Sequence, residues 1–194
     1  ATALIVMTCI ILIFVGGVNL KQFLLIGIIG AAGALLVVSI MSRNYDYIQK
    51  RIQSWVDPFA DSQGNTWQTC QSLIAIGSGG LFGLGLGESR QKYLYLPETK
   101  NDFVFSIVCE ELGLVGALTV VLLFTLLVIR GFYIAMRAKD KFGMLMAIGL
   151  TSHIGLQAFF NIAVVSNLIP NTGISLPFFS YGGTALILQL AEMG

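Results

Sequence analysis

The chain has 194 residues, of which 56% are hydrophobic and only 11% are charged, and its formal net charge is +1. A soluble domain carries roughly 25% charged residues, so this chain has too little polar surface to cover itself in water and is expected to lie in a lipid bilayer. The small net charge argues against nucleic acid as a partner, and three scattered cysteines with one histidine exclude a zinc-type spacing and a disulfide framework.

Apolar runs long enough to cross a bilayer recur along the sequence and predict an all-α polytopic membrane protein. The five expected transmembrane helices cover residues 1–18, 23–41, 103–129, 142–165 and 178–193, the last of them short. The first run starts at Ala1 without a charged segment or cleavage pattern before it. We therefore expect a single membrane domain, 1–194, that is truncated at its N-terminus and belongs to a longer protein.

Lysine and arginine in the short loops predict the orientation of this bundle. Five basic residues fall on one predicted side, whereas the loop 166–177 on the other side has none. These residues are Lys21, Arg130, Arg137, Lys139 and Lys141. Their side is expected to be cytoplasmic, which also places the C-terminus in the cytoplasm and residues 42–101 outside.

The segment 42–101 is expected to be a large extracellular loop that contains short interfacial helices. Residues 45–56 (YDYIQKRIQSWV) have apolar side chains at helical spacing, and Asp57-Pro58 should end that helix. Residues 67–77 are a second amphipathic candidate. The run GSGGLFGLGLG that follows fits no nucleotide-binding pattern, so its glycines Gly79, Gly83 and Gly87 predict close backbone packing. Backbone amides that approach a phosphate are the less favoured alternative.

The stretch LPETKNDFVF at 96–105 puts charged side chains at the start of the third predicted span. Asp102 fits either a first-turn acid that favours the helix dipole or a functional carboxylate. A capping role explains one acid. It does not explain Glu98, Lys100 and Asp102 together, beside Arg90 and Lys92.

Polar residues also occur inside the predicted spans, where they are expected to face the protein interior or a wet cavity. Glu110 and Glu111 lie two turns inside the third predicted span. Each of two predicted spans carries a polar stripe on one face. The stripe consists of Ser106, Glu110 and Gly113 in the third span and of His153, Gln157 and Asn161 in the fourth. Hydrogen bonds between helices explain both stripes more simply than direct chemistry. Two prolines and Gly182-Gly183 predict a bent start of the fifth helix, either around a cavity or as a rigid turn.

Three ordered motifs carry a resemblance to a known family: GSGGLFGLGLGESRQKYLYLPE, NDFVFSIVCEELG and LIPNTGISLPFFSYGGTAL. Over nearly its whole length the chain resembles the SEDS glycosyltransferases of shape, elongation, division and sporulation, and most closely the FtsW/SpoVE-like branch. The resemblance implies ten transmembrane helices, of which these would be the last five. It also implies a peptidoglycan glycosyltransferase of the bacterial cytoplasmic membrane that polymerises lipid II beside a class B penicillin-binding protein. This portion alone is expected to be inactive.

The resemblance also implies site residues. The family's essential aspartate, in the motif Pro-Glu-x-x-x-Asp-Phe, corresponds to Asp102, and its glutamate corresponds to Glu98, although Asn101 stands where the family usually has threonine. Asp102 would be the general base. Other candidates for the substrate site are Arg90, Lys92, Lys100, Ser180, Gly182 and Gly183. The three basic residues would meet the pyrophosphate, or alternatively anionic headgroups of membrane lipids. A divalent cation, Mg²⁺ or Mn²⁺, is expected from the family alone.

Two other functions remain open from the sequence. A lipid II flippase would use intramembrane polar groups as a path, namely Glu110, His153, Gln157 and Asn161. A structural scaffold would recruit the crosslinking enzyme through apolar surfaces and would tolerate replacement of the outer carboxylates.

Overall fold

The computed structural model describes residues 2–17, 27, 30, 33, 52, 54–59, 66–89 and 102–193. All regular secondary structure within these residues is α-helical, in agreement with the predicted class. Nearly all of the predicted second span lies outside the described residues, as do residues 42–51, 53, 60–65 and 90–101 of the predicted outer loop. The same holds for five residues of the predicted site region: Arg90, Lys92, Glu98, Lys100 and Asn101.

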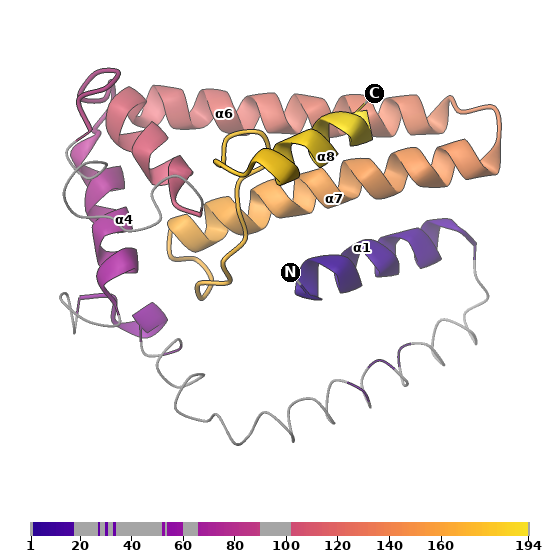
Figure 1. The fold of residues 1–194 in the computed structure, drawn as a ribbon, viewed down its shortest axis with the longest axis horizontal. Coiled ribbons are helices and arrows are strands. Elements are labelled where there is room, and N and C mark those ends of the chain that lie inside the picture. The colour runs from indigo at the N-terminus through magenta and orange to yellow at the C-terminus, as the bar shows by residue number, and fades with distance from the viewer. Residues whose placement is uncertain are drawn as a thin grey trace.

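Two long apolar helices form the centre of the molecule (Figure 1). Helix α6 (Val104–Met136) and helix α7 (Lys141–Val165) run antiparallel and are joined by a short turn, and both are long and apolar enough to cross a membrane. Asp140 begins α7 because its carboxylate accepts a hydrogen bond of 2.8 Å from the Gly143 amide. The third predicted span ended at residue 129, whereas α6 continues to Met136, so Arg130 lies on a helix and not in a loop.

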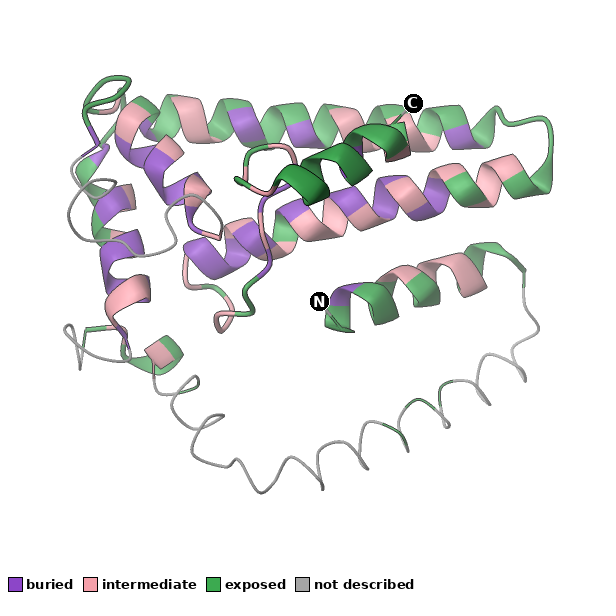
Figure 2. Cartoon of the chain, in the orientation of Figure 1, coloured by how far each residue is buried: buried purple, intermediate pink, exposed green. Residues whose placement is uncertain are grey.

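Small residues bring α6 and α7 close together. A Cβ atom at Gly131 of α6 would overlap the Thr151 side chain of α7, and one at Gly155 of α7 would lie 2.9 Å from Val128 of α6. The buried core continues along this seam through Phe105, Phe124, Ile154 and Ala158. Figure 2 shows burial concentrated on α7 and on the first part of α6, while the outer face of α6 is exposed.

Helix α1 (Thr2–Val15) lies along α7 in the opposite direction (Figure 1). Gly149 allows this contact, because a Cβ there would lie 3.2 Å from Leu12, and Gly16 lies beside Leu145. Helix α4 (Trp67–Ser78) packs at the other end of α6 and α7, where the Ser72 hydroxyl donates a 3.0 Å bond to the Val165 carbonyl. The predicted helix at 67–77 is thereby confirmed.

Helix α8 (Gly183–Met193) begins later than the predicted fifth span. Residues 177–182 instead form a turn, in which Phe178 has a positive φ of 63°. The Ser180 hydroxyl accepts a 2.8 Å bond from the Leu176 amide, and the Gln189 side chain accepts a 2.9 Å bond from the Phe178 amide. The buried ring of Pro177 and the contact between Phe124 and Phe179, with ring centroids 6.2 Å apart, hold this turn against α6. The turn therefore replaces the first part of the predicted helix.

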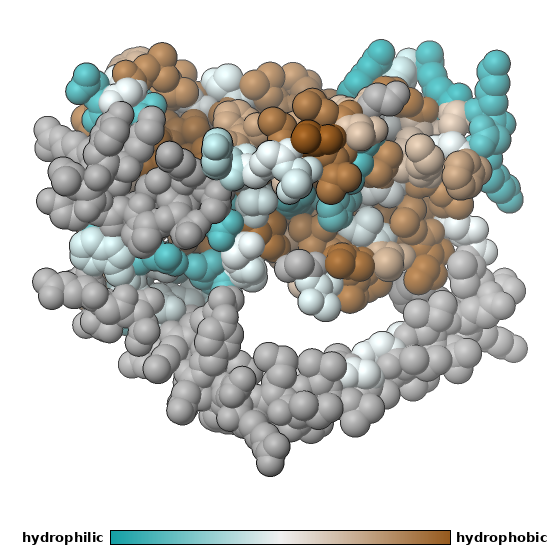
Figure 3. Space-filling view, viewed as in Figure 1, coloured by the Kyte–Doolittle hydropathy of each residue, from teal (hydrophilic) through white to brown (hydrophobic). Residues whose placement is uncertain are grey.

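The two ends of the α6–α7 pair differ in chemistry. Arg137, Lys139 and Lys141 are exposed around the α6–α7 turn, and Figure 3 shows hydrophilic side chains gathered at that end. Asp102 and the loop after Val165 lie at the other end, about 37 Å away along the 25 residues of α7. The prediction that these two groups lie at opposite ends is confirmed.

Candidate functional site

The candidate site is built on an interruption of α6. Gly113 has φ 65° and ψ −162°, which breaks the helix into a short segment before it and a long one after it. Glu110 and Glu111 therefore lie in the short segment before the break. The prediction that they lie inside the third span is confirmed, and the structure adds that the positive φ of Gly113 redirects the chain just after them.

The glycine-rich loop supplies the backbone hydrogen bonds that this break removes. In an unbroken helix the amides of residues 114 and 115 would bond to the carbonyls of residues 110 and 111. Four bonds to the loop replace them: Leu84 to Glu110 at 3.0 Å, Gly85 to Glu111 at 3.0 Å, Leu114 to Gly80 at 2.9 Å and Val115 to Leu81 at 3.2 Å. An unpaired backbone group is costly inside a membrane, so the loop and the broken helix require one another.

This exchange explains why the loop is rich in glycine. A Cβ at Gly79 would overlap the Cys109 carbonyl, and one at Gly83 would overlap the Glu111 carbonyl. Close packing is thus confirmed for these two glycines. At Gly87 no described atom lies within 4 Å of a Cβ position, so close packing stays a prediction there. The amides of Leu84 and Gly85 already donate to α6, which weighs against the alternative of a phosphate loop at these two positions.

Glu110 ties the end of the loop to α6. Its side chain is only 1% exposed and accepts a hydrogen bond from the hydroxyl of Ser89, which is also buried. Ser106, Glu110 and Gly113 are all buried, so the stripe predicted on this segment does face the interior. Ser89 is the interior partner of the buried acid, and nothing in the sequence pattern singled it out.

Asp102 lies immediately before α6. The helix begins at Val104 with Phe103 as its N-cap residue, so Asp102 lies one residue before the cap position. The half-buried Asp102 has its carboxylate oxygen Oδ2 3.6 Å from the position that a Cβ on Gly173 would occupy. Gly173 has φ +65° and donates its amide to the Asn171 side chain at 3.0 Å, which forms a tight turn. Gly173 was not among the predicted site residues, although the sequence Pro170-Asn171-Thr172-Gly173 is a turn signal.

The polar stripe on α7 faces the loop that carries Gly173. Asn161 donates from Nδ2 to the Asp102 carbonyl and to the Ile174 carbonyl, both at 2.7 Å. Gln157, one turn earlier, donates to the Ser175 carbonyl at 3.1 Å. These bonds join α6, α7 and the loop at the Asp102 end of the molecule.

A cavity of about 240 Å³ lies beside this junction. His153 and Gln157 of α7 line it together with Leu4 and Ile5 of α1 and residues 173–175 of the loop. Glu110 is not part of this lining and bonds to Ser89 instead. The structure therefore brings His153 and Gln157 together at a cavity, with Asn161 buried one turn beyond them, and places Glu110 in a different contact.

Ser180, Gly182 and Gly183 build the start of α8. The Ser180 hydroxyl closes the preceding turn, as described above, and the Gly182 carbonyl accepts a 2.9 Å bond from the Leu186 amide in the first turn of the helix. Gly183 is exposed. None of the three lines the cavity beside His153.

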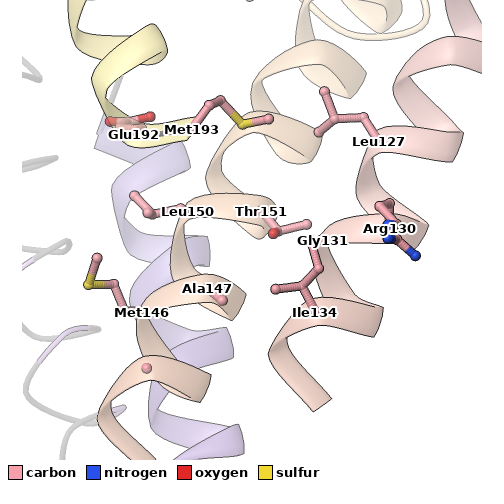
Figure 4. A pocket seen from close by; sticks show the side chains of 11 residues that line it. Leu127, Arg130, Gly131, Ile134, Met146, Ala147, Leu150, Thr151, Glu192 and Met193 are labelled. Atoms are coloured by element: carbon pink, nitrogen blue, oxygen red, sulfur yellow. The ribbon is translucent and has the colours of Figure 1, made fainter. Parts of the chain in front are cut away.

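A second cavity, of about 300 Å³, lies at the basic end of the molecule (Figure 4). It lies among α6, α7 and α8, with Arg130 and Thr151 on its walls and Glu192 and Met193 at one edge. Its α7 residues lie between Gly143 and Thr151, toward the opposite end of that helix from Asn161. It is therefore separate from the candidate site.

Within the described ranges, no group of three or more His, Cys, Asp and Glu side chains comes together in a way that could hold a metal ion. Asp102 is a carboxylate of the kind that Mg²⁺ and Mn²⁺ bind, but Glu98, the nearest predicted acid in the motif, lies outside those ranges.

Comparison with known proteins finds relatives that all belong to one family. The family model of FtsW, RodA and SpoVE, described as "Cell cycle protein", matches residues 1–194. Stage V sporulation protein E of Bacillus subtilis (strain 168) is 48% identical over 187 residues, which are 96% of this chain and 50% of that protein. The probable peptidoglycan glycosyltransferase FtsW of the same organism is 46% identical over 195 residues, 98% of this chain and 48% of that protein. The FtsW of Coxiella burnetii is 41% identical over 197 residues, 100% of this chain and 52% of that protein.

A solved structure shares the fold. It is described as "Structural coordination of polymerization and crosslinking by a peptidoglycan synthase complex", and one of its chains matches with a TM-score of 0.72 and 30% identity. The match covers 98% of this chain and 52% of that one. The chain thus spans about half the length of the curated relatives and of the solved chain that it matches.

Proposed function

Since this chain belongs to the FtsW/RodA/SpoVE family of integral membrane proteins, we propose that it forms part of a peptidoglycan glycosyltransferase that polymerises lipid II. The observation that carries the proposal is the position of Asp102. Its half-buried carboxylate lies at the end of the bundle opposite the basic turn, beside Gly173, a loop glycine that lines the cavity with His153 and Gln157. A general base for a lipid-linked sugar belongs at such a boundary between protein, lipid and water.

The proposed reaction joins two lipid-linked glycans. A sugar hydroxyl of the acceptor forms a bond to the anomeric carbon of the donor, and the bond from that carbon to the undecaprenyl pyrophosphate breaks. The hydroxyl proton passes to the Asp102 carboxylate, and the pyrophosphate leaves with the bonding electrons. Arg90, Lys92 and Lys100 are proposed to meet that leaving group. A divalent cation bound at Asp102 would supply further positive charge.

The cellular setting is part of the proposal. The basic end with Arg137, Lys139 and Lys141 would face the cytoplasm, and Asp102 would face the outer side of the bacterial cytoplasmic membrane, where residues 42–101 would form an extracellular loop. A class B penicillin-binding protein is the proposed partner. The solved relative that shares the fold is described as part of a complex that coordinates polymerization and crosslinking, which supports this choice.

The test is an assay of glycan strand formation from labelled lipid II by the purified full-length protein. Asp102→Asn should leave the protein folded and abolish polymerisation, because an amide cannot take the hydroxyl proton. Asp140→Asn is the matched control. It makes the same chemical change at the opposite end of α7, keeps an N-cap acceptor and should keep full activity. Unchanged strand formation by Asp102→Asn would refute the proposal.

A lipid II flippase is the competing function that the same variants distinguish. It would depend on groups within the bundle, so Asp102→Asn would still transport while replacements of His153 and Gln157 would not. The described contacts favour the enzyme, because Glu110 bonds to Ser89 rather than extending the polar lining beside His153.

A further inference from the structure

Asn161 makes an unusual pair of contacts for a residue near the end of an apolar helix. Its side chain is 0% exposed, and its Nδ2 atom donates to two main-chain carbonyls at once, those of Asp102 and Ile174. Asp102 precedes α6, and Ile174 belongs to the loop after α7. A single amide group therefore connects the residue proposed as the base to the loop that faces it.

The orientation of this amide carries a cost. Its Oδ1 atom is buried and has no hydrogen-bond partner among the described residues. Leaving a buried polar atom unpaired is unfavourable, so the two hydrogen bonds of the amide nitrogen hold the side chain in this orientation. In the reverse orientation Oδ1 would face the two carbonyl oxygens. No hydrogen bond could then form, because all three atoms are acceptors.

The contact restrains the main chain around Asp102. Asn161 holds the Asp102 carbonyl, and the next carbonyl, that of Phe103, accepts bonds from the amide and the hydroxyl of Ser106 at 3.1 Å and 2.7 Å. The Phe103 side chain is buried as well. Because consecutive peptide groups are held, the direction in which the Asp102 side chain leaves the backbone is set by Asn161 on one side and by α6 on the other.

We propose that Asn161 is a positioning residue for Asp102, holding its carboxylate beside Gly173, which lines the cavity. The proposal rests on the proposed function, because it assigns Asp102 the role of base. Asn161 does not take part in the chemistry. It sets where the carboxylate lies relative to the loop, and the same amide keeps Ile174 and therefore Gly173 in place.

The decisive variant is Asn161→Asp, which has nearly the same shape but whose ionised side chain cannot donate a hydrogen bond. Lipid II polymerisation by the full-length protein should show kcat lower by about 100-fold, as expected for a displaced catalytic group, while KM changes by about twofold or less. A normal kcat would overturn the proposal.

Gln157→Glu is the matched comparison. It makes the same amide-to-carboxylate change one turn away on the same helix face, and it removes a bond to the same loop without touching Asp102. Because Gln157 lines the cavity, this variant should raise KM rather than reproduce the loss of kcat. Equal losses of kcat in both variants would show that Asn161 only stabilises the loop, which would contradict a positioning role.

A second measurement does not depend on activity. Asp102→Cys is introduced into full-length protein from which all other cysteines have been removed, and its rate of reaction with a water-soluble maleimide is measured. Adding Asn161→Asp should change that rate several-fold, whereas adding Gln157→Glu should not. Equal rates in all three proteins would overturn the positioning role. Because Asp102→Cys removes the proposed base, none of the three proteins is expected to polymerise lipid II, and the labelling rate tests the position of residue 102 separately from the proposed function.

Asn161→Ser keeps the experiment decisive if the aspartate variant does not fold. Serine retains a donor but is too short to reach both carbonyls, so the same selective fall in kcat and the same change in labelling are expected. Wild-type kcat and labelling in this variant would overturn the proposal.

Discussion

Asp102 and Gly173 face each other across the junction between the start of α6 and the loop after α7. The glycine has φ +65°, and its missing side chain leaves the approach to the Asp102 carboxylate open. Asn161 fixes both partners through bonds of 2.7 Å, and Gln157 holds the neighbouring Ser175. At the scale of single residues, the site therefore depends on Gly173 and on the amide side chains of Asn161 and Gln157, as well as on the Asp102 carboxylate.

Gly173→Ala should reduce polymerisation more than it reduces stability. The new methyl group would lie 3.6 Å from Oδ2 of Asp102 and obstruct the approach of a sugar hydroxyl, and the left-handed backbone would cost about 1–2 kcal/mol. Gly87→Ala has the same kind of backbone strain, with φ +86° and no described atom within 4 Å, and serves as the control in the same assay. A Gly173→Ala protein as active as Gly87→Ala would count against an open approach at residue 173.

At the scale of elements, the broken helix α6 and the glycine-rich loop form one unit. Breaking a helix inside a membrane leaves amides and carbonyls without partners, and the loop supplies four main-chain bonds in their place. Glu110 secures the end of that loop through Ser89. The short first segment of α6, which follows Asp102, is thereby held at a fixed angle to the long second segment.

Two glycines close together in sequence test this unit. Gly79→Ala should destabilise the protein by about 1–3 kcal/mol, because its methyl group would overlap the Cys109 carbonyl in a region where neither backbone can move easily. Gly77→Ala, in the last turn of α4, has open space around it and should be neutral or stabilising by about 0.5–1 kcal/mol. Thermal unfolding in detergent, followed by circular dichroism, would measure both changes, and equal unfolding midpoints would argue against the packing described.

At the scale of the whole molecule, a hairpin of two spanning helices separates a basic end from the end that carries Asp102. Helix α7 is covered by α1, α4 and α6, whereas the outer face of α6 is exposed and apolar, as a surface in contact with lipid would be. The polar cavity beside His153 lies on the covered side of α7, against α1. Under the proposed function, a lipid-linked sugar would approach Asp102 from one end while its tail stays in the membrane.

The proposed orientation has a direct test in whole cells. Thr172 and Lys139 are both exposed, one beside the Asp102 junction and the other in the basic turn. In full-length protein without other reactive cysteines, Thr172→Cys should react with a membrane-impermeant maleimide from outside. Lys139→Cys should react only after the membrane is permeabilised. The opposite pattern would reverse the assignment of the two faces.

The sequence by itself determined what kind of protein this is. Its scarcity of charge requires a lipid environment. Its apolar runs predict spans at 103–129 and 142–165, where the structure has α6 and α7, and helical periodicity shows that Glu110 and Asn161 lie on inward faces. These are local properties, set by the composition and spacing of neighbouring residues, so they are readable without the fold.

The tertiary structure alone decided how these parts meet. The break at Gly113 is possible only because loop residues 80–85, far away in sequence, replace its hydrogen bonds, and a pattern of apolar residues carries no sign of that exchange. The delayed start of α8 depends likewise on contacts of residues 176–180 with Gln189 and α6. Asn161 reaches across 59 residues of sequence to Asp102 and 13 to Ile174. Such pairings depend on which surfaces come together when the helices pack, and that is decided by the whole chain rather than by any one segment of it.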